Sequence, residues 1–208
     1  MDDRGLVSRL AAPSASGPRT EVVVYGMVNK ATHGMIVRDH GEAAWSAVAQ
    51  RAELDAETFV SNRSYDDSVT YALVGAASSV LGLPVRDVLF AFGRFWILTT
   101  AREGYGPLLD ASGASLHAFL QSLPTFHTRV SLSLPALRPP TFTVLDESAT
   151  HVRLRYESER KGLVPFVEGL LDGLAEHYRE RVTVLHEQRA EVVGHDIFLI
   201  VWDERSPS

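Results

Sequence analysis

The hydrophobic pattern of this chain changes its period at Pro139-Pro140, and that change limits the fold more than any other feature. Before the two prolines, apolar residues recur every three or four positions, which is typical of amphipathic helices. The segments that show it are Val22–Val37, Glu42–Ala52, Ser68–Leu81, Val85–Thr99 and Leu116–Leu134, with Tyr105–Leu109 interpreted as a short connection or turn.

After the two prolines, alternating segments rich in Val, Thr, Ile and aromatic residues predict strands. They are Thr141–Leu145, Val152–Ser158, Val182–Gln188 and Ile197–Trp202, and Leu163–Tyr178 has the helical period between them. Helices and strands are therefore segregated rather than alternating, which favours an α+β fold. We expect a helical N-terminal part followed by a four-stranded antiparallel sheet with an inserted helix.

The N-terminal segment differs from the rest of the chain in composition. Residues 11–20 are small, polar and rich in Pro and Gly, which is typical of a linker. We expect residues 1–20 to be a flexible tail and residues 21–208 to form a single domain.

Composition excludes several classes of function. The 208 residues include no Cys, which removes disulfides, thiolate metal sites and cysteine nucleophiles. The net charge of −6 disfavours non-specific nucleic-acid binding. No run of about 18 uncharged apolar residues is present, so no membrane span is expected. The first 20 residues match a signal peptide poorly, which predicts a cytoplasmic protein.

One histidine interrupts an aliphatic helix face. Positions 116, 120, 123, 130 and 134 are Leu, Leu, Leu, Val and Leu, and His127 occupies the same stripe. A buried histidine satisfied by a backbone carbonyl is one interpretation, and a neutral imidazole that binds iron in an apolar cavity is the other. The periodicity does not choose between them.

The sequence Tyr156-Glu-Ser158-Glu-Arg160 places three hydrogen-bond donors at alternate positions. In an extended strand these side chains share one face. A phenol, a hydroxyl and a guanidinium together would receive an anion with several oxygens, such as a carboxylate pair or a phosphate. Taken singly, Arg160 is more simply interpreted as a surface arginine and Tyr156 as a tyrosine that packs on the sheet.

Together with His127, this motif resembles the H-NOX family, the haem nitric oxide/oxygen-binding domains, and in particular stand-alone bacterial members and the haem domain of soluble guanylate cyclase. The resemblance covers residues 22–203, and Pro124 departs from it because the family more often has an acidic residue there. Further similar stretches are Val24–Ala31, Phe92–Trp96, Gly104-Tyr105, Phe119–His127, Pro139-Pro140 and Arg160–Leu163.

The resemblance implies that haem b is the cofactor, with His127 as its iron ligand and Pro140 against the porphyrin. Tyr156, Ser158 and Arg160 would hold the propionates. On the opposite side of the haem, Phe166 occupies the place where oxygen-binding members have a tyrosine. Val28, Leu163 and Leu170 would extend this apolar wall, while Trp96 could pack there or donate a hydrogen bond.

The function implied is sensing rather than catalysis, because no catalytic constellation is evident. Nitric oxide and carbon monoxide would bind and oxygen would not. Nitric oxide opposite His127 would weaken the iron–histidine bond and let the helix shift. We expect a separate partner, a histidine kinase or a cyclic-di-GMP enzyme, and neither nucleic acid nor membrane. The alternatives are a haem-free small-molecule binding domain of the same fold, or an enzyme using Tyr156 and Arg160 on an acidic substrate.

Overall fold

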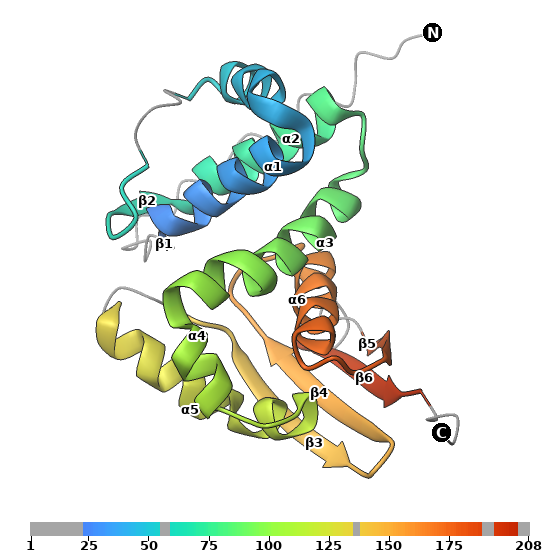
Figure 1. The fold of residues 1–208 in the computed structure, drawn as a ribbon. Helices are drawn as coiled ribbons and strands as arrows, with labels where there is room; N and C mark the ends of the chain where they lie inside the picture. Colours follow the sequence, from blue (N-terminus) through green and yellow to red (C-terminus); the bar gives the residue numbers. More distant parts are fainter. Residues whose placement is uncertain (1–22, 55–58, 135–137, 189–193, 204–208) are drawn as a thin grey trace, which may run out of the picture.

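The computed structural model describes residues 23–54, 59–134, 138–188 and 194–203, so the predicted tail lies outside the described residues. The elements form two groups, one made of the first helices and one built on a sheet (Figure 1). A long helical run connects the two groups and crosses between them.

The first group contains α1 (Gly26–Arg51) and α2 (Asp67–Leu81), with the short strands β1 (Val23–Tyr25) and β2 (Ser64–Asp66) paired antiparallel. The two helical segments expected within 22–52 are joined in α1, and Gly41 at φ +83° makes the bend between them. Asp66 caps α2 by accepting from the Ser68 N–H at 2.8 Å, and Gly82 ends it in the left-handed conformation.

The connecting run is α3 (Val85–Phe95), a π-helical turn over Trp96–Ala101, and α4 (Arg102–Ala111). The prediction of a turn at Tyr105–Leu109 is wrong, because this segment belongs to α4. Tyr105 takes the non-helical angles φ −138° and ψ 19°, and Pro107 follows this break, where a helix tolerates the missing N–H. No single helix among the described residues is long and apolar enough to cross a membrane.

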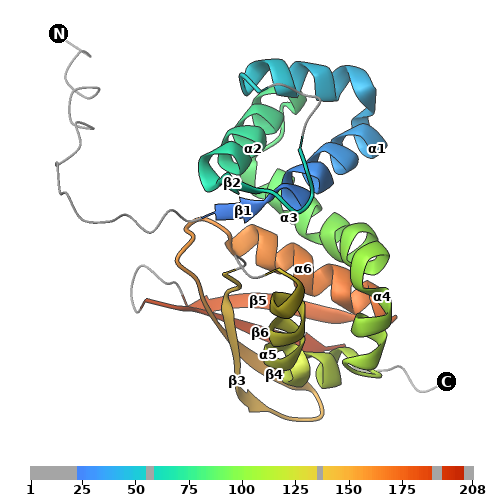
Figure 2. The ribbon, with the colours of Figure 1, turned by 90° about the vertical axis from the view of Figure 1, so that its left-hand side faces the viewer.

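The second group contains α5 (Leu116–Ser133), α6 (Val164–His177) and a four-stranded sheet. Its strands are β3 (Thr141–Glu147), β4 (His151–Glu157), β5 (Val182–Gln188) and β6 (Asp196–Trp202). All neighbours are antiparallel, in the order β3-β4-β6-β5. The expected α+β class, with its helix inserted into the sheet sequence, is confirmed (Figure 2).

Two hydrophobic cores stabilise the two groups. One lies between the inner face of the sheet, α5 and α6, and includes Leu154 and Phe198. The other lies among α1, α2 and α3, and includes Ile36 and Leu73. An internal cavity lies where these two cores meet.

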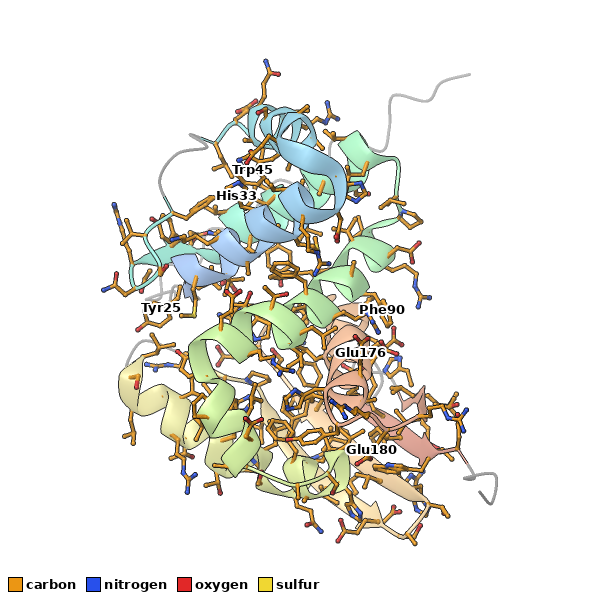
Figure 3. All side chains as sticks on the ribbon, viewed as in Figure 1. Tyr25, His33, Trp45, Phe90, Glu176 and Glu180 are labelled. Atoms are coloured by element: carbon orange, nitrogen blue, oxygen red, sulfur yellow. The ribbon has the colours of Figure 1, made fainter. Side chains whose placement is uncertain are left out.

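Helix α3, which packs with α1 and α2 in the first group's core, crosses α6 of the second group at Gly93 and Gly169. A Cβ at Gly93 would collide with the carbonyl oxygen of Phe166, and one at Gly169 with that of Phe90. Phe90 is labelled at this crossing in Figure 3. Only glycine allows two backbones to come this close, so these two positions determine how α3 sits on α6.

Candidate functional site

A cavity of about 280 Å³ lies between the two groups of elements. Its walls come from β1, α1 and α2 on one side, and from α5, α6, β3 and β4 on the other, with α3 and the π-helical turn between. All ten residues predicted for the site line it: Val28, Trp96, His127, Pro140, Tyr156, Ser158, Arg160, Leu163, Phe166 and Leu170.

His127 reaches the cavity from the middle of α5. The five aliphatic residues of its stripe are all buried, as the helical spacing predicts, whereas His127 itself is half-buried at the cavity wall. Burial lowers the pKa of His127 to about 4, although a hydrogen bond with the Pro140 backbone acts in the opposite direction. The imidazole is therefore neutral at physiological pH.

The hydrogen bond with Pro140 also orients the ring. Because the bond raises the pKa of His127, the Pro140 carbonyl accepts from a ring N–H. The other ring nitrogen then carries a lone pair, in the arrangement that metal-binding histidines usually adopt. The ring centroid of Phe142 lies 5.8 Å from that of the imidazole, so the immediate surroundings are apolar.

Tyr156, Ser158 and Arg160 do converge on the cavity, but by a different route from the one predicted. Strand β4 ends at Glu157, so only Tyr156 projects from the sheet. Ser158 and Arg160 lie in the turn that follows, where the Arg160 N–H donates to Ser158 Oγ at 3.1 Å and Gly162 has φ +74°. Burial raises the pKa of Tyr156, with a partly compensating hydrogen bond from Ser158.

The guanidinium of Arg160 is paired with Asp67, a residue that the sequence analysis missed. Arg160 Nε donates to Asp67 Oδ2 at 2.9 Å and Nη2 donates to Oδ1 at 3.3 Å, and both side chains are less than one-fifth exposed. Arg160 Nη1 also donates to the carbonyl oxygen of Arg138 at 3.2 Å. This rim of the cavity is thus mixed in charge rather than purely donating.

Asp67 comes from the first turn of α2, and so joins the two groups of elements across the cavity. One turn further along α2 is Tyr71, whose hydroxyl donates to the carbonyl oxygen of Lys161 at 3.1 Å. The only signal in the sequence is the pair Asp66-Asp67 at a helix start, where one carboxylate suffices for the cap. The partner of the second carboxylate, 93 positions away, could not be inferred.

Another part of the wall is apolar. Phe166 and Trp96 both pack against Phe92, with ring centroids 5.1 and 6.2 Å apart, and the Trp96 contact is edge-on. Val28, Leu163 and Leu170 complete this side. The contact of Trp96 with Phe92 is the packing role considered for it from the sequence.

Within the described ranges, no three or more His, Asp or Glu side chains form a group that could hold a metal ion by themselves. The cavity instead presents one neutral imidazole in an apolar wall and a separate polar rim.

The fold and this cavity define an α+β domain with an internal, mostly apolar cavity and a single histidine in the cavity wall. The chain belongs to the haem-NO-binding (HNOB) family, whose profile matches residues 25–186. Domains of this family bind haem and act as gas sensors, and are not themselves catalytic.

Curated relatives include two soluble guanylate cyclases of Caenorhabditis elegans. The chain is 27% identical to gcy-35 over 196 residues, which are 89% of this chain and 28% of that protein. It is 28% identical to gcy-33 over 152 residues, which are 73% of this chain and 16% of that protein. The chain thus spans less than one-third of the length of these relatives.

Solved structures show the same fold. An H-NOX protein from S. oneidensis in the Fe(II)NO ligation state has a TM-score of 0.78 and 21% identity, and the match covers 87% of this chain and 100% of the other. The unliganded Fe(II) H-NOX protein from K. algicida has a TM-score of 0.78 and 20% identity, and the match covers 89% and 100% of the two chains.

Proposed function

We propose that this chain binds haem b with His127 as the iron ligand and senses nitric oxide. The observation that carries the proposal is the state of His127: a neutral imidazole at an apolar cavity wall, with one ring nitrogen held by Pro140. Haem iron is commonly bound by one such histidine. The cavity lining also fits haem, because its mostly apolar wall ends at a polar rim.

Tyr156, Ser158 and Arg160 are the residues we assign to the two propionates. Each lines the cavity and each can donate to a carboxylate oxygen. Arg160 already binds Asp67 in a two-point ion pair, so it would share its donors between Asp67 and a propionate. Pro140 lies next to His127 on the same wall and would contact the ring of the cofactor.

When bound, the haem supplies a ferrous iron with one position open to a diatomic gas. The wall that we assign to that side is formed by the apolar side chains of Val28, Phe166 and Leu170. The ring of Trp96, packed on Phe92, completes it. Bound oxygen is polar and gains from a hydrogen-bond donor, whereas nitric oxide and carbon monoxide depend on one much less. This wall supports selectivity for nitric oxide and carbon monoxide over oxygen.

The output we propose is a conformational change. A change in the bond between His127 and the haem iron would let the helix that carries His127 shift. A histidine kinase or a cyclic-di-GMP enzyme is the partner class we assign to a cytoplasmic sensor of this kind. Neither nucleic acid nor membrane is needed.

The absorption spectrum of protein expressed with added haem precursor tests the proposal. We expect an intense Soret band, reduced protein that binds nitric oxide and carbon monoxide, and no stable oxygen complex in air. His127→Gly should lose the haem, and added imidazole should restore it. His117→Gly is the matched control, since His117 lies on the same helix and contacts Glu147 outside the cavity.

A haem-free binding domain is the second candidate, favoured by the Arg160–Asp67 pair. Because this pair already satisfies the rim, an apolar ligand without carboxylates could also fill the chamber. Absence of a Soret band in protein that is folded by circular dichroism would support this candidate and reject the first.

A further inference from the structure

Proline occupies the middle of the helix that carries His127. Pro124 lies three residues before the histidine, within α5. Proline has no N–H, so it cannot donate to the carbonyl four residues earlier, and its ring crowds that carbonyl. The Thr128 hydroxyl donates to the Pro124 carbonyl oxygen at 2.9 Å, a bond to the i−4 carbonyl that often bends helices. Two bending features therefore fall on one turn, directly beside His127.

The part of α5 before Pro124 is fixed to the sheet and to α6. Leu116, Phe119, Leu120 and Leu123 all belong to the core under the sheet. Polar contacts add to this packing: Gln121 donates to both oxygens of Glu147 on β3, at 2.9 and 3.0 Å.

Glu180 anchors the beginning of the same half. One carboxylate oxygen accepts from the Leu116 N–H at 3.1 Å, and the other accepts from the Trp202 indole at 2.5 Å. A carboxylate at a helix N-terminus is stabilising because it satisfies free N–H groups and faces the positive end of the helix dipole. Glu180, labelled in Figure 3, thus ties α5 to β6 and to the residues that follow α6.

The part of α5 after Pro124 packs on a different cluster. Val130, with Leu134 just beyond the helix, contacts Tyr25 of β1, and Met27 and Tyr105 pack around them. Tyr25 lies between the first helices and α5 (Figure 3). Two residues of this half also touch the sheet core: Phe126 packs against it, and the His127 ring lies 5.8 Å from that of Phe142. Leu132, at 80% exposed, packs little.

We propose that Pro124 is a positioning residue that divides α5 into a fixed half and a hinged half bearing His127. The hinged half transmits the ligation state of His127 to Tyr25, at the start of α1, while Leu116–Leu123 stay with the sheet. This inference rests on the proposed function for its trigger, but the hinge itself is a property of the apoprotein. A helix without this proline would move as a rigid body, so a displacement at His127 would also displace Leu116–Leu123.

Hydrogen–deuterium exchange with mass spectrometry tests the hinge in the full chain. In the apoprotein, we expect amides of 125–134 to exchange at least about tenfold faster than those of 117–123, and Pro124→Ala to narrow this difference. In haem-loaded ferrous protein, adding nitric oxide should change exchange in 24–28 and 125–134 and leave 117–123 unchanged. In Pro124→Ala the change should spread into 117–123 or be lost from 24–28.

Thr125→Ala is the matched control, since Thr125 is exposed on the neighbouring position and leaves the backbone bonds intact. Should Pro124→Ala fold poorly by circular dichroism, Thr128→Ala removes the second bending feature and should give a smaller shift in the same direction. Equal exchange in the two halves of the wild-type apoprotein, or a nitric oxide response in 117–123 of the wild type, would overturn the hinge. Failure to load haem would instead reject the proposed function and leave the apoprotein comparison decisive.

Discussion

The two groups of elements meet in two places that differ in kind. At the α3–α6 crossing, Gly93 and Gly169 bring backbone against backbone with no room for a methyl group. Across the cavity, the same groups are joined by polar side chains, through Asp67–Arg160 and Tyr71–Lys161. A backbone contact has one geometry, whereas side-chain bridges can exchange partners. The crossing therefore fixes the arrangement, and the cavity is where a ligand can enter and alter it.

Disrupting the crossing should give the largest effect. Gly93→Ala places a methyl group against the carbonyl oxygen of Phe166, so α3 and α6 must separate. We expect a loss of about 3 kcal/mol of unfolding free energy, at the upper end for overpacking. Urea unfolding measures it. Gly75→Ala is the control, because Gly75 is exposed in α2 with open space around it, and alanine there should stabilise by about 0.5–1 kcal/mol. Equal stability of the two variants would refute the contrast.

Changing the polar bridge should have a smaller and asymmetric effect. Arg160→Met leaves the carboxylate of Asp67 without its guanidinium partner, and should cost about 2 kcal/mol in the apoprotein and weaken haem binding. Asp67→Asn should also destabilise the apoprotein, but it frees Arg160 donors and should slow the loss of haem. Transfer of haem to excess apomyoglobin measures that rate. Equal acceleration of haem loss in both variants would show that Asp67 does not compete for Arg160.

The pH dependence of apoprotein stability tests whether His127 is buried in the cavity wall in its neutral form. Above pH 6.5 His127 is neutral in both folded and unfolded chains, so it contributes no pH dependence. As pH falls from 6.5 to about 4, His127 takes up a proton in the unfolded chain but not in the folded chain, where it is buried. The free energy of unfolding therefore falls. Between pH 7 and pH 5 the wild type should lose about 2 kcal/mol more than His127→Leu does. Parallel pH profiles for the two proteins would show that His127 is not buried in the neutral form.

The smallest expected effect is on gas affinity, and it comes from changes in the apolar wall that contains Phe166 and Val28. Phe166→Tyr adds one hydroxyl beside Phe92 and should raise oxygen affinity at least about tenfold while affecting carbon monoxide affinity little. Oxygen and carbon monoxide titrations of the reduced protein compare the two gases directly. Val28→Ile, which adds bulk but no donor to the same cavity, should not favour oxygen. A similar gain for both gases in Phe166→Tyr would indicate a change of volume rather than a new hydrogen bond.

The sequence by itself determined whatever depends on local repetition. The stripe of α5 predicted which residues would be buried and that His127 would share their face, because side chains three and four apart on a helix point the same way. The change of period at Pro139-Pro140 predicted the segregated α+β order for the same reason. The prediction at Tyr105–Leu109 was wrong, because Gly and Pro disfavour a helix locally and the non-helical angles of Tyr105 let α4 absorb them.

Only the tertiary structure decided how distant residues combine. It carried Ser158 and Arg160 past the end of β4 into a turn, so their convergence on the cavity does not come from strand alternation. It also brought Asp67 to Arg160 and fixed the two parts of α5 in different cores. Periodicity describes one element at a time, whereas an ion pair between residues 93 positions apart depends on how two elements pack.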